Sequence, residues 1–377
     1  MYYKTYKFRL YPNSTQRLLI NKTFGKYRFI YNYFLSKIRL EYKTANENYN
    51  YYHEYLTKKY SFLNEIDNYT VKKILSNLDK NYKLLKYSKE NLKFKDKYHK
   101  NSYFVSNCNS NNNSVGYIKL DLKNRKVTIP KLNEIKIRGY KKLLNINGKI
   151  LSYTISRESN DKYYISILFM INEHANKVKL KMIVGIDLGI KNLLTLSDGK
   201  VYENCKYISK YEKRIKTIQL KLSKKVKGSN NYYKYKNKLA ILYSKLANAR
   251  KHYIHKITTE ITDKYDIISC ENLHVKNMIM NGKKSNLSKN INDACFNEIL
   301  RQLKYKSELK GKYFFQIDDY YPSSQICSRC DNQDKKYKNL NERNYKCTKC
   351  NLEIDRDLNA SINIMFEGVK MYIKKYC

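Results

Sequence analysis

Alternating apolar and polar positions open the chain and predict a strand over residues 1–10. Pro12 ends this strand, and Asn13 or Ser14 can cap the helix that follows, in which apolar positions recur at helical spacing. The lysines and arginines of this helix fall largely between the apolar positions, so it is amphipathic and basic. A second periodic stretch predicts a pair of helices over residues 60–97.

Short alternating segments replace the helical spacing after residue 98, following a polar run at residues 107–114 that predicts an exposed loop. Turns such as the one at Asn160 and Asp161 separate these segments. The pattern predicts a small antiparallel sheet or barrel, which the strand over residues 1–10 joins. The alternating segments are residues 117–122, 125–130, 134–139, 151–157 and 162–171.

A different pattern follows, in which apolar residues surround a single carboxylate, Asp187. This pattern predicts a buried strand that ends near the aspartate, and an Asp-Gly pair soon after it marks a hairpin turn. A second such strand, residues 265–270, ends at Glu271. The remaining predicted elements are basic helices over 207–225 and 230–263, a polar loop over 281–290, a helix over 291–310 and a strand over 312–318. The fold class predicted for the whole chain is α+β and multidomain.

Charge is the compositional feature that adds most to this picture. The 377 residues include 76 Lys and Arg against 33 Asp and Glu, which gives a net charge of +43. A surplus of this size repels itself in the folded state and needs a polyanion to offset it, so nucleic acid is the expected partner. The 40 tyrosines, interleaved with lysine, suit stacking on unpaired bases, although an AT-rich coding sequence would also enrich tyrosine.

A membrane surface is the competing explanation for the positive charge. No apolar run approaches the roughly 20 residues of a spanning helix, and no signal-peptide core follows Met1. We therefore expect no membrane partner and no export.

Four of the nine cysteines form two Cys-x-x-Cys pairs with sixteen residues between them. Tetrahedral zinc sites use this arrangement with about 15 to 20 intervening residues, and four thiolates close the coordination shell, which favours a structural role. Two redox pairs are the alternative, but neither opens a thioredoxin-like unit. The predicted ligands are Cys327, Cys330, Cys347 and Cys350, whereas Cys108, Cys205, Cys270, Cys295 and Cys377 are interpreted as ordinary thiols.

Three carboxylates are predicted to lie at strand ends or at a helix start, namely Asp187, Glu271 and Asp357. Magnesium prefers oxygen ligands, so three acids gathered at one point can hold a pair of divalent cations. Each acid also has a structural alternative: Asp187 forms a turn, Glu271 a strand-end salt bridge, and Asp357 the N-cap of a helix over 358–366. Asp355 competes with Asp357, but the helical residues that follow favour Asp357 at the cap.

The order of these motifs resembles that of TnpB (OrfB), the transposon-encoded RNA-guided DNA nucleases related to type V CRISPR effectors. The combined order is specific, whereas a single motif is not, and the likeness covers nearly the whole chain. The matching segments are residues 4–12, 24–32, 129–132, 163–166, 185–191 (GIDLGIK), 271–273 (ENL), the two cysteine pairs, and 355–361 (DRDLNAS).

This resemblance implies an RNase H-like (RuvC) nuclease domain in which Asp187, Glu271 and Asp357 are catalytic and bind two Mg²⁺ ions, with one structural Zn²⁺ on the four cysteines. It implies cleavage of double-stranded target DNA next to a transposon-adjacent motif, by a monomer that carries one guide RNA from the transposon end. It also implies the cytoplasm or nucleoid of a prokaryote. The sequence departs from the family at Asp331, which follows Cys330 where Gly is usual and which loosens the predicted knuckle turn.

The resemblance also divides the chain into four parts. They are a split β-barrel (wedge) domain at 1–10 and 100–181, a helical recognition domain at 11–99, the RuvC domain at 182–326 and 351–377, and a zinc-ribbon insert for target nucleic acid at 327–350.

Two other functions stay open at this point. An RNA-guided DNA-binding regulator would keep the basic surface and the zinc site but would not cut DNA. A RuvC-like resolvase or recombinase would use the three acids without a guide RNA.

Overall fold

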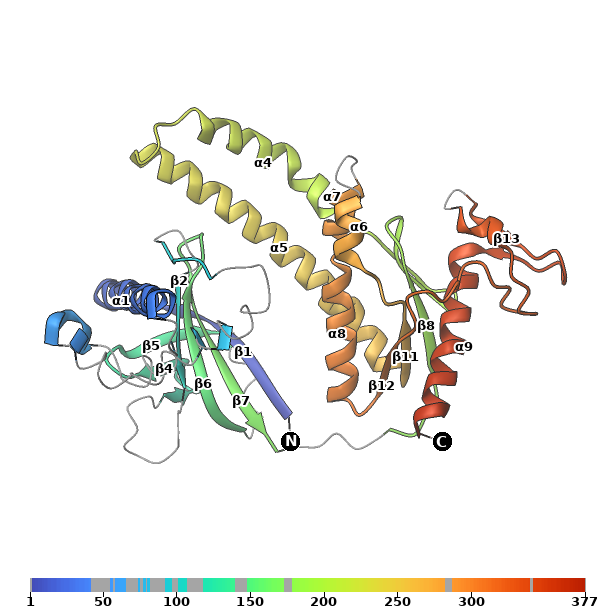
Figure 1. Ribbon diagram of the computed structural model, residues 1–377, viewed down its shortest axis with the longest axis horizontal. Coiled ribbons are helices and arrows are strands. Elements are labelled where there is room, and N and C mark those ends of the chain that lie inside the picture. The colour runs from blue at the N-terminus through green and yellow to red at the C-terminus, as the bar shows by residue number, and fades with distance from the viewer. Residues whose placement is uncertain are drawn as a thin grey trace. The chain divides into compact units, whose positions relative to one another are not determined.

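The computed structural model has two compact units, residues 1–173 and 174–377 (Figure 1). Each unit has its own sheet and its own hydrophobic core, so the predicted α+β, multidomain class is confirmed. None of the described helices combines the length and apolarity needed to cross a bilayer. The structure describes residues 2–41, 55–56, 58–65, 74, 77–78, 80–81, 92–96, 101–106, 118–139, 148–172, 178–281, 287–339 and 342–376.

The first unit is an antiparallel sheet of seven strands in the order β2-β6-β7-β1-β5-β4-β3. Their bounds are β1 (Tyr2–Tyr11), β2 (Asn101–Ser106), β3 (Lys119–Asp121), β4 (Lys126–Ile129), β5 (Asn133–Arg138), β6 (Gly148–Arg157) and β7 (Tyr163–Ile171). The first strand lies between distant parts of the chain, since Leu10 is paired with Ile137 on one side and Tyr163 on the other. The pattern along the chain did not predict β2.

The helix α1 (Ser14–Glu41) begins directly after β1, as predicted. Asn13 caps it in a reciprocal arrangement: the N–H of Gln16 donates to Asn13 Oδ1 over 2.8 Å, and the N–H of Asn13 donates to Gln16 Oε1 over 3.0 Å. The predicted loop at 107–114 lies outside the described residues, as does most of the helix pair predicted at 60–97.

The second unit is a five-stranded sheet in the order β10-β9-β8-β11-β12. The strands are β8 (Ile183–Leu188), β9 (Asn192–Leu196), β10 (Val201–Glu203), β11 (Ile267–Cys270) and β12 (Tyr313–Gln316). Strands β8, β11 and β12 run parallel to one another. Strand β9 pairs antiparallel with β8 on one side and with β10 on the other. The two predicted basic helices, α4 (Tyr207–Ser223) and α5 (Asn230–Lys264), connect β10 to β11.

The last helix, α9 (Arg356–Tyr376), lies along β8 and β11 on one face of this sheet (Figure 1). Two glycines permit the close approach. A Cβ on Gly185 of β8 would overlap the carbonyl oxygen of Ser361, and a Cβ on Gly368 would overlap the hydroxyl of Ser269 in β11. The face that carries Gly185 and Ser269 is therefore the face that α9 covers.

One predicted helix is wrong in detail. The helix predicted over 291–310 is two helices, α7 (Leu287–Ala294) and α8 (Phe296–Leu309), and α7 begins inside the predicted loop 281–290. Cys295 separates them, because its φ of 55° is left-handed and cannot continue a helix. No Gly or Pro marks this break in the sequence. A further helix, α6 (Val275–Asn281), precedes the loop.

Candidate functional site

Asp187 and Glu271 are neighbours at the ends of two adjacent parallel strands. In the pairing of β8 with β11, Ile186 lies opposite Cys270, and the next residues along the two strands are Asp187 and Glu271. Adjacent strands are about 4.8 Å apart, and residues two positions apart share a face. Because the residue two positions before each carboxylate contacts α9, both carboxylates belong to the face that α9 covers.

The start of α9 supplies the third carboxylate. Asp355 Oδ1 accepts hydrogen bonds from the N–H groups of Asp357 (2.9 Å) and Leu358 (3.0 Å). Asp355 is therefore the N-cap, so the structural alternative that gave this position to Asp357 is wrong. The helix begins earlier than predicted, at Arg356, because the Asp355 side chain satisfies the first N–H groups. Asp357 consequently lies in the first turn, where its carboxylate has no capping role.

The three predicted acids affect one another electrostatically. Desolvation raises the pKa of Asp187 well above its usual value, and the charges of Glu271 and Asp357 raise that pKa further. Desolvation also raises the pKa of Glu271, against the effect of a hydrogen bond that Ser323 Oγ donates to Glu271 Oε1 over 2.8 Å. Carboxylates perturb each other in this way only when they are close. Segments far apart in the sequence thus meet in one acidic cluster.

Two arginines offset part of the negative charge, and the sequence predicted this role for neither. Arg356 Nη2 lies 3.2 Å from Asp357 Oδ1, and Arg343 Nη1 lies 3.4 Å from Asp357 Oδ2. Arg356 is buried, and its charge lowers the pKa of Asp187. Arg343 belongs to the segment between the two cysteine pairs, and nothing local in the sequence marks its contact with α9.

The carboxylates are close but do not form a tight ligand shell. In the part of the chain that the structure describes, only the cysteine quartet brings three or more His, Cys, Asp or Glu ligand atoms within 4.8 Å of one another. Repulsion between like charges and the pairing of Asp357 with the two arginines both favour this spread. The donor set itself fits Mg²⁺, because a hard cation would relieve the repulsion among three partly desolvated carboxylates.

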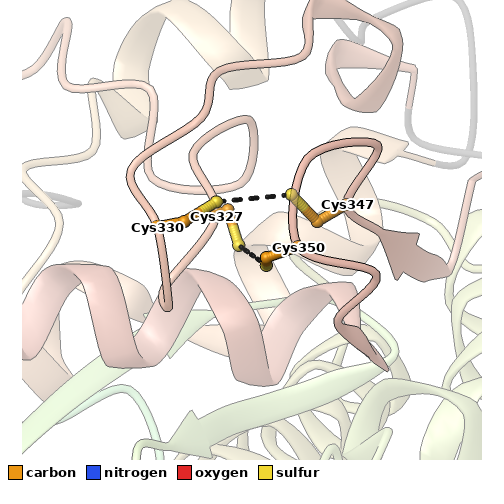
Figure 2. A group of neighbouring side chains, drawn as sticks. All are labelled: Cys327, Cys330, Cys347 and Cys350. Carbon is orange, nitrogen blue, oxygen red and sulfur yellow. Dashed lines mark hydrogen bonds between the residues drawn. The ribbon is translucent and has the colours of Figure 1, made fainter.

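The four predicted cysteines do converge (Figure 2). Cys327 Sγ lies 3.6 Å from Cys350 Sγ, and Cys330 Sγ lies 3.5 Å from Cys347 Sγ. A tetrahedral site with Zn–S bonds of about 2.3 Å places its sulfurs about 3.8 Å apart. Burial raises the pKa of Cys347, but hydrogen bonds from the N–H groups of Cys350 and Lys349 outweigh it and bring the pKa to about 6. The quartet can therefore hold a zinc ion.

Tight turns present both cysteine pairs. The N–H of Asp331 donates to the carbonyl of Cys327, and the N–H of Asn351 to that of Cys347, each over 3.0 Å. Asp331 and Asn351 have φ values of 57° and 54°. Asp and Asn adopt this left-handed conformation more readily than other side chains. The departure from Gly at Asp331 is therefore compatible with a closed turn.

Comparison with known proteins identifies the family. Residues 166–281 match the family model OrfB_IS605, described as "Probable transposase". "Putative RNA-guided DNA endonuclease InsQ" of Escherichia coli (strain K12) is 30% identical over 97% of this chain and 92% of its own length. The chain belongs to the OrfB (TnpB) family. Two further models of this group match, a Cas12f1-like TNB domain at residues 296–364 and a helix-turn-helix domain at residues 1–47.

Other relatives of this OrfB chain are similar over different lengths. "Putative RNA-guided DNA endonuclease" of Streptomyces pristinaespiralis is 26% identical over 97% of the chain and 89% of its own length. "CRISPR-associated endodeoxyribonuclease Cas12f1" of Sulfoacidibacillus thermotolerans is 23% identical over 59% of the chain and 54% of its own length. The fold is similar to that in "Cryo-EM structure of the Cas12f1-sgRNA-target DNA complex", with a TM-score of 0.62, 16% identity and coverage of 97% and 98%.

Proposed function

We propose that this OrfB protein is an RNA-guided DNA endonuclease that cuts target DNA beside a short transposon-adjacent motif. The acidic cluster of Asp187, Glu271 and Asp357 carries the proposal. Burial and the charges of Glu271 and Asp357 raise the pKa of Asp187, burial and the charge of Asp357 raise that of Glu271, and the described contacts of the cluster include no opposing cation other than arginine. Relatives that are named RNA-guided DNA endonucleases support the guide and the substrate.

In this proposal the three acids hold two Mg²⁺ ions, which when bound activate a water molecule and stabilise the leaving oxygen of the phosphodiester. The protein prepares the site in two ways. The paired ends of β8 and β11 fix Asp187 and Glu271 side by side, and the Asp355 cap fixes the first turn of α9 and with it Asp357. Arg356 pairs with Asp357 and helps to orient this carboxylate.

Nucleic-acid binding is assigned to the basic surfaces. Residues 213–259, in α4 and α5, contain fourteen Lys and Arg and no Asp or Glu. Such a hairpin suits the phosphates of a guide–target heteroduplex, which is recognised by its A-form shape, while base pairing with the guide selects the sequence. A monomer with one guide RNA from the transposon end would make up the complex.

The assignment of domains predicted from the sequence is part of this proposal. The sheet that includes β1 and residues 100–181 would be the wedge domain, residues 11–99 the recognition domain, and residues 182–326 with 351–377 the RuvC nuclease. The insert at 327–350 would be a zinc ribbon closed by one structural Zn²⁺ on its four cysteines, with target nucleic acid on its basic surface.

A single purification tests the proposal. The protein is expressed with its flanking transposon end, co-purified RNA is sequenced, and DNA matching the guide is incubated with the complex in Mg²⁺ or in chelator. We expect a discrete RNA and Mg²⁺-dependent cutting. Asp187→Asn, Glu271→Gln and Asp357→Asn should each slow cleavage by about a thousandfold or more, equivalent to about 4 kcal/mol, with target binding retained.

The matched control is Asp161→Asn, which removes an exposed carboxylate of the first unit at a left-handed position that Asn tolerates. It should cut like the wild type. Target binding without cutting by the wild type would indicate the regulator instead. Cutting without bound RNA would indicate a resolvase or recombinase.

A further inference from the structure

Ser323 contacts one of the three acids directly. It follows β12 by seven residues, is only 4% exposed, and donates its hydroxyl to Glu271 Oε1 over 2.8 Å. An ionised carboxylate offers about four acceptor positions on its two oxygens. The serine therefore occupies one position and leaves the others available to a metal ion.

The backbone of Ser323 is held on both sides. Its N–H donates to the carbonyl of Tyr321 over 2.9 Å. Its own carbonyl accepts a hydrogen bond of 2.8 Å from the Nδ2 of Asn363, a side chain of α9 that is 2% exposed. The backbone that carries the hydroxyl is therefore held in place from two sides, which keeps Ser323 Oγ within hydrogen-bond distance of Glu271 Oε1.

The same helix fixes the chain that follows Ser323. Asn363 Nδ2 and Asn359 Nδ2 both donate to the carbonyl of Ile326, each over 2.7 Å, and Asn359 Oδ1 accepts from the N–H of Ser328 over 3.0 Å. These two asparagines lie one turn apart on α9 and hydrogen-bond to the residues on either side of Cys327. Ser323 is thus anchored to the helix that carries Asp357 and to the first cysteine turn.

We infer that Ser323 is a positioning residue that orients the Glu271 carboxylate for divalent-metal binding, with Asn363 as its anchor. The inference rests on the proposed function, since it assumes that Glu271 is a metal ligand. Groups that hydrogen-bond metal ligands typically contribute about 10- to 100-fold to metal affinity. Loss of the Ser323 hydroxyl should therefore weaken metal binding at Glu271 by about tenfold.

The test measures metal affinity apart from cleavage. Zinc-loaded, nucleic-acid-free full-length protein is titrated with Mn²⁺, and free Mn²⁺ is followed by electron paramagnetic resonance. Ser323→Thr and Ser323→Val form the key pair, because the two side chains have the same shape and only Thr keeps the hydroxyl. We expect wild-type affinity for Thr, and about tenfold weaker binding for Val and for Ser323→Ala. The Mg²⁺ concentration for half-maximal cleavage should rise by the same factor.

Two controls separate positioning from general damage. Ser324→Ala deletes the neighbouring hydroxyl, which has no hydrogen bond among the described residues, and should bind Mn²⁺ like the wild type. In a Glu271→Gln background, Ser323→Val should add no further loss, since the group that it orients has changed.

Equal affinity of the Thr and Val variants would overturn the inference, as would an equal loss in the Ser324→Ala variant. A wild-type protein that neither binds Mn²⁺ nor cuts DNA would instead overturn the proposed function.

Discussion

At the scale of single residues, residues 355–357 show how hydrogen bonding assigns different roles to two identical side chains. Asp355 accepts from two N–H groups at the start of α9, whereas Asp357 faces two arginines and the acids of β8 and β11. The cap needs an acceptor oxygen but no charge, because Asn caps helices about as well as Asp. A metal ligand among carboxylates needs the charge.

This difference predicts that Asn is tolerated in place of Asp355 but not in place of Asp357. Asp355→Asn should keep both stability and cleavage, and Asp355→Ala should lower the free energy of unfolding by about 1 kcal/mol through loss of the cap. Asp357→Asn should leave stability close to that of the wild type but abolish cleavage. Urea denaturation and DNA cleavage measure the two effects. Loss of cleavage in Asp355→Asn as complete as in Asp357→Asn would make Asp355 a ligand.

The raised pKa of Asp187 predicts a pH dependence in Mg²⁺-free protein. The folded state retains a proton that the unfolded state, with a pKa near 3.8, releases. The stabilisation that this proton provides is fully present below the pKa of Asp187 in the unfolded state. It is lost as the pH rises through the pKa of Asp187 in the folded state. Asp187→Asn avoids this loss and should raise the melting temperature at about pH 8, by about 2–4 °C per kcal/mol. The advantage should vanish near pH 4.

Differential scanning fluorimetry of the zinc-loaded protein in Mg²⁺-free buffer measures this difference. Adding Mg²⁺ should stabilise the wild type and not the variant, because the cation takes over the role of the proton. A variant that melts below the wild type at pH 8 would show that ionised Asp187 already has a favourable partner.

At the scale of elements, the packing of α9 on the sheet decides whether the acids meet. Gly185 and Gly368 let the helix axis approach β8 and β11 more closely than any side chain would allow. Asp187 lies two residues after Gly185, and Asp357 lies one turn before Ser361, which that glycine contacts. The helix–strand distance therefore sets the distance between these two carboxylates.

Gly185→Ala should consequently separate the acids. The new methyl group would overlap the backbone of α9, and overpacking of this kind destabilises by about 1–3 kcal/mol. The matched change Gly25→Ala, inside α1 with open space around the Cβ, should instead stabilise by about 0.5–1 kcal/mol. Chemical denaturation compares them. Cleavage should fall in the Gly185→Ala variant alone. If this variant is less stable but cuts like the wild type, the distance between α9 and the sheet does not determine activity.

The insert between the cysteine pairs depends on its metal for a different reason. Its core consists of Cys327, Tyr337, Tyr345 and Cys347, with few partly buried neighbours. So small a core does not fold without a metal or a disulfide. A zinc chelator should therefore speed amide hydrogen exchange by at least about tenfold across residues 327–350, while β1 and β7 of the first unit keep their protection. Equal protection with and without zinc would contradict a structural role.

The sequence predicted elements wherever a local period or turn marked them. Strands β8 and β11, the basic helices α4 and α5, and the order of the cysteine pairs follow from such patterns. Strand β2 was missed because Asn101–Ser106 follows a lysine-rich run and gains its strand conformation from pairing with β6, about fifty residues later. The break between α7 and α8 at Cys295 was missed because no Gly or Pro marks it in the sequence.

The candidate site was predictable in its acids and cysteines but not in their neighbours. Asp187 and the cysteines are marked by an unusual residue in an apolar strand or by fixed spacing. Ser323 and Arg343 are ordinary residues that matter because the fold brings them to a carboxylate, in one case over 52 positions of sequence. Arg356 adjoins Asp357 in the sequence, but nothing in the sequence shows that its side chain is buried against that carboxylate. Only tertiary structure provides this information.

At the scale of the whole molecule, the net charge of +43 connects stability to nucleic-acid binding. Repulsion between like charges opposes the folded state, and both salt and a polyanion relieve it. Salt acts differently on binding, because each phosphate contact releases counterions and becomes weaker as salt rises. A rise in salt concentration should therefore increase the stability of the folded protein and lower its affinity for nucleic acid.

We expect the melting temperature of the nucleic-acid-free protein to rise between about 0.05 and 0.5 M salt while RNA affinity falls, with a logarithmic slope of about −0.7 to −0.9 per phosphate contact. Replacing the exposed Lys221, Lys224 and Lys227 of the α4–α5 hairpin with Gln should make this slope shallower and stabilise the free protein. The matched change of Lys370, Lys374 and Lys375 in α9 removes the same charge. If both triple variants change the slope equally, total charge determines RNA binding; if only the hairpin variant does, the hairpin contacts the phosphates.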